Sequence, residues 1–243
     1  MNNNPATFGL IGRNISYSFS KKYFSDKFKN LLLPNYRYDL FDLNSLEEFE
    51  SVLNSPNLKG LNVTIPYKVD IIPLLDEVSE EAQAIGAVNT VVFKEGNKIG
   101  YNTDAFGFKK TLEIHRKNKH HKALILGDGG AAKAVRYVLD SLGIPHHTVS
   151  RKGEITFENL QEDLVSSSPL IIQTTPVGTF PNTNDCVPFP FQALSDDHLI
   201  FDLIYNPTIT QFMENSAKRG AKCVNGYFML ESQAEKAWQL WQP

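Results

Sequence analysis

The chain has 243 residues, 42% of them hydrophobic, with 24 basic and 27 acidic residues and a formal net charge of −3. This composition can fill one large or two small cores, and the lack of an extended basic run disfavours nucleic acid as a partner. No segment is long and apolar enough to span a membrane, and the first twelve residues lack the apolar run of a secretory signal. Cys186 and Cys223 form neither a CxxC nor a zinc-ligand spacing, so we expect a cytoplasmic protein without disulfides or a metal site.

The first hundred residues alternate between strand and helix patterns. Strands are predicted at 7–11, 36–43 and 60–65, and helices from about Ser20, over 45–53 and in turns up to about residue 85. Apolar residues Phe24, Phe28, Leu31 and Leu32 form the stripe of the first helix. Two strands within 86–93 and 98–102 flank the turn EGN. This order predicts a mostly parallel sheet with helical crossovers, closed by a hairpin.

A second series of elements begins near Asp104 with a helix to about Lys117. The charged stretch HRKNKHHK (115–122) follows and is interpreted as a solvated connection. Further strands are predicted at 145–150, 169–173, 198–203 and 221–224, with a helix from about Thr208. In the final helix, one face is apolar and is interpreted as core packing; it carries Leu230, Ala234, Ala237, Trp238 and Trp241.

A glycine loop lies between a buried strand and a helix in LILGDGGAAKAV (124–135). Gly127, Gly129 and Ala132 fit the GxGxxA fingerprint, in which a tight turn brings backbone N–H groups to a pyrophosphate at a helix N-terminus. The alternative is a simple tight turn, but the strand before and the helix after favour dinucleotide binding. Asp128 is unusual there, because a carboxylate weakens pyrophosphate binding unless it points to solvent.

The next strand ends in SRK (150–152), where NAD-selective sites usually carry an acidic residue. Arg151 and Lys152 instead favour a 2′-phosphate and therefore NADP, since a guanidinium offers a fork of donors and a permanent charge. The alternative is two exposed basic residues on a turn.

The stretch KGLNVTIPYK (59–68) places a lysine directly after a strand. Val63 and Ile65 alternate with Asn62 and Thr64, and Pro66 ends the strand. Parallel sheets bind ligands beyond their carboxyl strand ends, so Lys68 is either a solvated charge or a proton-handling group.

Taken together, the chain resembles shikimate dehydrogenase nearly from end to end. The matching stretches are IGRNISYSFS (11–20), KGLNVTIPYK (59–68), AIGAVNTV (84–91), GYNTDAFGF (100–108), LGDGGAAKA (126–134), SRK (150–152), QTTPVG (173–178), DLIYNPTIT (202–210) and NGYFMLESQA (225–234). The resemblance implies an α/β fold with an N-terminal substrate-binding domain on a mostly parallel sheet and a C-terminal Rossmann-type NADP-binding domain. The expected boundaries are 1–103 plus the returning helix 226–243 for the first domain, and 104–225 for the second.

The resemblance also implies the site residues. Lys68 and Asp104 match the catalytic pair. The residues matched to substrate binding are Ser18, Ser20, Asn62, Thr64, Asn89, Tyr205 and Gln233, with the alternative that one serine only caps a helix. Those matched to cofactor binding are Gly127, Gly129, Gly130, Ala131, Ser150, Arg151, Lys152, Thr174, Leu203 and Gly226.

The implied activity is the reversible NADPH-dependent reduction of 3-dehydroshikimate to shikimate, in chorismate and aromatic amino-acid biosynthesis. One alternative is an NAD-preferring quinate/shikimate dehydrogenase, which Arg151 and Lys152 oppose. Another is a non-catalytic nucleotide or shikimate sensor, which an intact Lys68 and Asp104 oppose. The expected partner is a small-molecule substrate, with no nucleic acid or membrane, and the protein is expected to be a monomer or a homodimer.

Several positions depart from the family pattern. Tyr17 stands where the family usually has histidine, and Asn14 where it has proline. SRK lacks the asparagine of the usual NRT, and Gln173 and Thr179 also differ from the commonest residues. None of these removes a group assigned to the chemistry.

Overall fold

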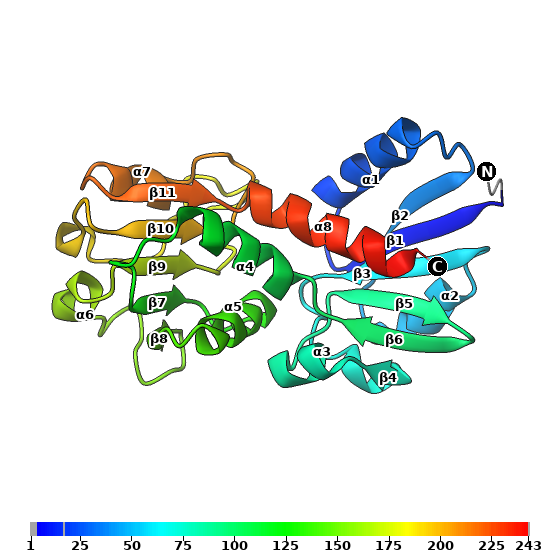
Figure 1. The fold of residues 1–243 in the computed structure, drawn as a ribbon, viewed down its shortest axis with the longest axis horizontal. Helices are drawn as coiled ribbons and strands as arrows, with labels where there is room; N and C mark the ends of the chain where they lie inside the picture. The colour runs from blue at the N-terminus through cyan, green and yellow to red at the C-terminus, as the bar shows by residue number, and fades with distance from the viewer. Residues whose placement is uncertain (1–3, 17, 243) are drawn as a thin grey trace. The chain divides into compact units, whose positions relative to one another are not determined.

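The structure is a computed structural model that describes residues 4–16 and 18–242. The described residues form two compact units. The first unit runs to Thr103 and resumes at Ala234, and the second is Asp104–Gln233. Each unit is built on one sheet (Figure 1). The return to the first unit thus falls inside the last helix, later than the expected residue 226.

The sheet of the first unit has the strand order β2-β1-β3-β5-β6-β4. Its strands are β1 (Ala6–Gly12), β2 (Tyr36–Asp42), β3 (Leu58–Val63), β4 (Glu77–Val78), β5 (Thr90–Lys94) and β6 (Asn97–Tyr101). β1 is parallel to β2 and β3, whereas β5 is antiparallel to β3 and β6. The predicted parallel sheet with a closing hairpin is confirmed, although the first hairpin strand begins at Thr90 and not at residue 86.

Both faces of this sheet are covered. The helices of the unit are α1 (Phe19–Asn30), α2 (Phe49–Leu53) and α3 (Glu80–Ile85), with 3-10 turns at Leu46–Glu48 and Ile72–Leu74. Along β1, Phe8 packs with Phe24 of α1 on one face, and Ile11 packs with Phe49 of α2 on the other. This alternation is the period of two expected of a central strand.

The predicted stripe of the first helix is wrong at its end. Leu31 and Leu32 are 48% and 73% exposed, because α1 stops at Asn30. Leu32 adopts a φ of 56°, in the left-handed region, where the chain leaves the helical path. The hydrophobic period therefore extended two residues beyond the helix itself.

The last helix, α8 (Tyr227–Trp241), contributes its C-terminal part to the first unit. The indole Nε1 of Trp241 donates to the Val91 carbonyl at 3.0 Å, and its ring lies where a Cβ on Gly60 would be. Lys27 of α1 forms an ion pair with Glu235 at 2.7 Å. The prediction that this face serves core packing is confirmed for Ala234, Ala237, Trp238 and Trp241, which pack with Phe8 and its neighbours. Leu230 is not among the residues of that cluster.

The second unit contains a five-stranded sheet of order β11-β10-β9-β7-β8, parallel throughout. Its strands are β7 (Ala123–Leu126), β8 (His146–Val149), β9 (Leu170–Gln173), β10 (Leu199–Asp202) and β11 (Lys222–Asn225). Its helices are α4 (Asp104–His115), α5 (Gly130–Ser141), α6 (Glu162–Ser166) and α7 (Gln211–Ala217), with a 3-10 turn at Phe191–Ala193. The predicted strand–helix alternation is confirmed as a Rossmann-type sheet.

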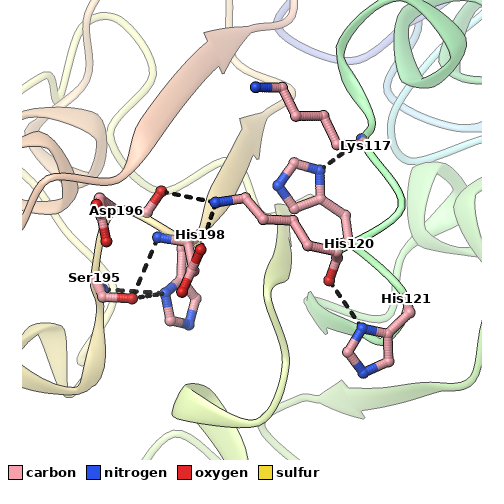
Figure 2. A network of polar contacts seen from close by, with 8 residues as sticks. Lys117, His120, His121, Ser195, Asp196 and His198 are labelled. Atoms are coloured by element: carbon pink, nitrogen blue, oxygen red, sulfur yellow. Dashed lines mark hydrogen bonds and ion pairs between the residues drawn. The ribbon is translucent and has the colours of Figure 1, made fainter.

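The charged stretch 115–122 precedes β7 and is not wholly solvated. His120 is only 4% exposed, and its Nδ1 accepts the backbone N–H of Lys117 at 2.9 Å. Lys119 pairs with Asp197 in the loop before β10, where the buried His198 accepts the N–H of Ser195 at 3.0 Å (Figure 2). The interpretation as a solvated connection is therefore wrong for His120, whose ring closes the turn that enters β7.

Acid should weaken this turn. Burial, reinforced by the charge of Lys119, lowers the pKa of His120. The native state then binds fewer protons than the unfolded chain below about pH 6.5, so His120 makes stability fall as the pH drops through that value. We expect the wild type to lose more Tm between pH 7.5 and pH 5.5 than H120N, in which an amide oxygen keeps the acceptor without titrating.

The control for this comparison is H147N, at an exposed histidine of the same unit, which should follow the wild type. Thermal melts of the three proteins at both pH values make the comparison. An equal loss of Tm in H120N and the wild type would show that His120 does not govern the acid response.

Candidate functional site

Lys68 lies on a fixed stretch of backbone beyond β3. The strand ends at Val63, before the predicted residue 65, and the Thr64 N–H bonds the Ile11 carbonyl at 2.8 Å. The buried Tyr67 donates its hydroxyl to the Leu43 carbonyl at 2.7 Å. The carbonyl of Lys68 itself accepts the N–H of Val88 at 2.7 Å. Its backbone position is therefore set on both sides, as a positioned side chain requires.

A buried polar network connects two of the predicted substrate-binding residues of the first unit. Tyr38 donates its hydroxyl to Oδ1 of Asn62 at 2.7 Å, and the Ser20 side chain bonds the same hydroxyl. The Asn62 amide nitrogen donates to Thr90 Oγ1 at 3.2 Å. Burial raises the pKa of Tyr38 well above its usual range, so it stays a neutral donor. Tyr38 and Thr90 were not predicted as site residues, because their connection depends on contacts between distant strands.

Asn89 extends this network toward the first helix of the second unit. Its Oδ1 accepts the Thr103 N–H at 2.7 Å and its Nδ2 donates to Thr103 Oγ1 at 3.1 Å. Thr103 directly precedes Asp104, which is buried in the first turn of α4. Asn89 thus fixes the backbone that leads into Asp104. Lys68 and Asp104 belong to different units, and their pairing stays a prediction.

The two serines lie at the start of α1, a helix of 12 residues. Ser18 is the N-cap, and its Oγ accepts the N–H of Ser20 at 3.3 Å. The helix-cap alternative is therefore real for Ser18, and a role toward a carboxylate stays a prediction for both serines. Nearby, a Cβ at Gly12 would collide with Thr64 and Ile15. The glycine therefore allows Thr64 to pack against the end of β1.

The departure at Asn14 has a structural counterpart. Asn14 has a φ of 56°, which proline cannot adopt, and its N–H donates to Asp42 Oδ1 at 2.7 Å. The second oxygen of Asp42 accepts the Ile15 N–H at 3.2 Å. Asp42 therefore holds the loop that leads toward the serines. Tyr17 lies outside the described residues.

In the second unit, the glycine loop has the geometry of an anion cradle. Gly127 has a φ of 115°, and a Cβ there would press on the Thr174 hydroxyl. Gly129 is the N-cap of α5, a 12-residue helix whose first residues are Gly130 and Ala131, and no atom would meet a Cβ at Gly129 within 4 Å. Exposed N–H groups at a helix N-terminus fit a pyrophosphate.

The charges around this loop suit a phosphorylated ligand. Asp128 pairs with Arg136 of α5 at 2.7 Å and its side chain is 58% exposed, so its carboxylate is compensated and faces solvent. The turn after β8 is held by the Ser150 N–H, which donates to the Ile155 carbonyl at 3.0 Å. The turn presents Arg151 and Lys152, both exposed.

Three neighbouring strands of the same sheet end in a polar residue, Gln173, Asp202 and Asn225, here called the strand-end row. Asp202 is the register partner of both others. In each case a side-chain oxygen accepts the backbone N–H two residues further on. The acceptor pairs are Gln173 with Thr175 at 2.6 Å, Asp202 with Ile204 at 3.1 Å and Asn225 with Tyr227 at 3.2 Å.

Each of these three hydrogen bonds spans one residue, and that residue is a predicted cofactor-binding residue. Thr174 lies between Gln173 and Thr175, and Leu203 and Gly226 hold the same place in the other two turns. Gly226 is also a close approach, since a Cβ there would collide with the Leu203 carbonyl. The spanned residues were predicted from the sequence, whereas the side chains that close the turns were not. The signal available was a polar residue as the last position of three apolar strands.

The remaining predicted residues of the second unit are Tyr205 and Gln233. Tyr205 is half-buried in the loop after β10. Gln233 lies on α8, where a Cβ at Gly107 of α4 would press on the Met229 carbonyl and on Gln233. Gly107 therefore permits close packing of α4 against α8, which sets the position of Gln233.

The described residues contain neither a membrane-spanning helix nor a metal-binding cluster. No helix there has the length and hydropathy needed to cross a bilayer. Likewise, residues 4–16 and 18–242 contain no cluster of three or more His, Cys, Asp and Glu side chains arranged to hold a metal ion.

The fold and the glycine loop define an α/β protein with a Rossmann-type dinucleotide-binding unit and a separate unit that carries Lys68. A family model described as the shikimate dehydrogenase substrate binding domain matches residues 10–91. A shikimate dehydrogenase (NADP(+)) of Methanosphaera stadtmanae is 36% identical, covering 96% of this chain and 89% of its own.

Solved structures agree with this match. The shikimate 5-dehydrogenase of Thermus thermophilus in complex with NADP(H) and shikimate has a TM-score of 0.86 and 30% identity, covering 98% of this chain and 93% of that one. The quinate dehydrogenase of Corynebacterium glutamicum in complex with NAD has a TM-score of 0.85 and 25% identity, covering 98% and 94%. The chain belongs to the shikimate dehydrogenase family.

The network at Asn62 gives a prediction about stability. Y38F leaves the ring stacked on Phe24, with centroids 4.6 Å apart, but removes the donor to Asn62 and the acceptor for Ser20. Leaving a buried acceptor unsatisfied costs about 1–2 kcal/mol, so we expect the Tm to fall by roughly 2–8 °C.

The matched control is Y36F, in the same strand, where no described residue bonds the tyrosine hydroxyl. Calorimetry should show Y36F melting with the wild type. If both variants melt together, the Tyr38 hydroxyl contributes nothing to this unit.

Proposed function

We propose that this chain is an NADP-dependent shikimate dehydrogenase that catalyses the reversible reduction of 3-dehydroshikimate to shikimate, a step of chorismate and aromatic amino-acid biosynthesis. The observation that carries the proposal is the match to a relative named shikimate dehydrogenase (NADP(+)) over 96% of the chain, at 36% identity. Lys68, Asp104 and the glycine loop are all intact within this match.

NADP, when bound, accepts or supplies the hydride, so the protein must manage the proton of the substrate hydroxyl. In the reduction direction the Lys68 ammonium protonates or electrostatically stabilises the developing alkoxide. Asp104 orients the lysine and the hydroxyl. The fixed backbone on both sides of Lys68 supports this assignment, because positioning contributes strongly to such proton transfers.

The other expected residues hold the two ligands. Ser18 and Ser20 bind the substrate carboxylate at the start of α1, with Tyr205 near it. The ring hydroxyls bond to Asn62, Thr64 and Asn89, and Gln233 reaches the substrate from α8. Because both hydrogens of the Asn62 amide are used inside its network, we expect Asn62 to serve the ligand as an acceptor.

For the cofactor, Gly127, Gly129, Gly130 and Ala131 would hold the pyrophosphate, and the turn Ser150–Lys152 would hold the 2′-phosphate. Thr174, Leu203 and Gly226 would contribute to the same cofactor site. Two basic side chains and no carboxylate at the 150–152 turn favour NADP over NAD. We further expect a cytoplasmic enzyme that acts as a monomer or a homodimer.

The alternative with a specific observation behind it is an NAD-preferring quinate/shikimate dehydrogenase. The quinate dehydrogenase in complex with NAD shares the fold at a TM-score of 0.85, so fold alone does not separate the two activities. The 150–152 turn favours the NADP-dependent activity, because its two cations can pair with a 2′-phosphate but not with the free 2′-hydroxyl of NAD.

One assay tests the proposal: NADP reduction followed by absorbance with shikimate, against quinate and against NAD. We expect the pair of shikimate and NADP to be preferred, and K68A to lower kcat by ~10²–10⁴-fold with a small change in KM. K59A, at an exposed lysine of β3, is the matched control and should keep the wild-type kcat. A K68A variant with near-normal kcat removes Lys68 from the mechanism.

Arg151 provides a separate test of cofactor choice. R151A should weaken NADP binding about tenfold or more and leave NAD binding nearly unchanged, since only NADP carries the phosphate that the guanidinium grips. R219A, at an exposed arginine after α7, is the control. Dissociation constants from calorimetric titration decide the outcome, and equal losses for both cofactors would mean another role for Arg151.

A further inference from the structure

Asp202 is a buried carboxylate without a compensating cation. It is 0% exposed at the end of β10, and no cationic side chain of the described residues pairs with it. Burial raises the pKa of Asp202 to about 6. The charge of Asp202 acts on two thiols, since it helps burial to raise the pKa of both Cys186 and Cys223. Burial of an unpaired charge lowers the stability of the fold unless hydrogen bonds compensate for the lost hydration.

Both oxygens of this carboxylate bond the same loop. Oδ1 accepts the Ile204 N–H at 3.1 Å, and Oδ2 accepts the Thr210 hydroxyl at 2.5 Å. Thr210 in turn accepts the Met213 N–H at 3.2 Å as the N-cap of α7. One side chain thus fixes the beginning and the end of the loop 203–210.

The loop so held is bonded to its neighbours on two further sides. The Asn206 carbonyl accepts the Phe180 N–H at 3.0 Å, which ties the loop after β9 to the loop after β10. The Asn225 amide donates to the Thr208 carbonyl at 2.9 Å, and the Gly226 N–H donates to the Ile204 carbonyl at 3.0 Å. A shift of the loop 203–210 would therefore also move the segments that carry Thr174 and Gly226.

We propose that Asp202 is a positioning residue for the dehydrogenase reaction. Its two carboxylate oxygens hold the loop 203–210, and through it the loop after β9, in the single conformation that places Leu203 and Tyr205 for cofactor and substrate. This inference rests on the proposed function, because the roles of Leu203 and Tyr205 belong to it. Asp202 acts through these residues and does not itself touch the reacting atoms.

The variant D202N distinguishes a role in positioning the loop from a contribution to the stability of the fold. The loop presents two donors, and an amide has one acceptor oxygen, so D202N can satisfy only one of them. The variant also removes the buried charge. Because the folded pKa of Asp202 lies above its unfolded value of about 3.9, the native state binds more protons, and wild-type stability falls as the pH rises from about 4 to about 6. D202N lacks this loss.

The experiment compares the wild type with D202N, T210V and T210S, and with D163N at an exposed aspartate of α6 as the control. Tm at pH 5 and 7.5, kcat and KM for shikimate and NADP, the dissociation constant of NADP, and hydrogen exchange of the loop amides are measured. We expect kcat/KM for NADP to fall about tenfold or more in D202N and T210V, because a bond to a charged acceptor is lost. T210S, which keeps the hydroxyl, and D163N should behave as the wild type.

A positioning role predicts a specific combination of results for D202N. Between pH 5 and pH 7.5, the Tm of D202N rises relative to that of the wild type. At the same time kcat/KM stays low and the Ile204 amide exchanges faster. Wild-type kinetics in D202N, or an activity loss that matches a lower folded fraction, overturns the proposal. If the wild type does not oxidise shikimate, the proposed function fails, whereas NADP affinity and loop exchange in D202N still decide the role of Asp202.

Discussion

The second unit depends on the hydrogen bonds that the strand-end row makes to the backbone. A parallel sheet delivers its chain into turns at one edge, and N–H groups buried there must find an acceptor. Gln173, Asp202 and Asn225 each supply one, to the residue two positions further on. Because these three residues are register partners across neighbouring strands, the three turns are fixed relative to one another. Three of the residues expected to meet the cofactor, Thr174, Leu203 and Gly226, lie inside those turns.

In the first unit, the buried polar groups are satisfied by neutral side chains. Tyr38, Asn62 and Thr90 form a chain of buried side-chain bonds across β2, β3 and β5, and Asn89 continues it to the backbone of Thr103. Fully paired networks of this kind rigidify a site without leaving a buried charge. The predicted substrate-binding residues Ser20, Asn62 and Asn89 are thus also members of this structural network, which explains why each position carries an amide or a hydroxyl.

Elements with a clear local pattern were predictable from the sequence, and connections between distant residues were not. The glycine loop, the Rossmann alternation and the stripe of α8 follow from spacing within a few residues. β4 has two residues and α6 five, too short for any period. The burial of His120 and the pairing of Tyr38 with Asn62, 24 residues apart, depend on tertiary packing that composition does not encode. The resemblance named the residues of the candidate site but not the side chains that support them.

The chemistry of each loop explains why the middle member of the strand-end row is charged while its neighbours are amides. Gln173 and Asn225 face one N–H donor and backbone carbonyls, so an oxygen and an NH₂ group are both used. Asp202 faces two donors, the Ile204 N–H and the Thr210 hydroxyl, whose own oxygen is taken by the Met213 N–H. Only a carboxylate accepts from both without presenting a hydrogen to either. The unfavourable burial of a charge therefore follows from the path of the loop, which brings two donors to one side chain.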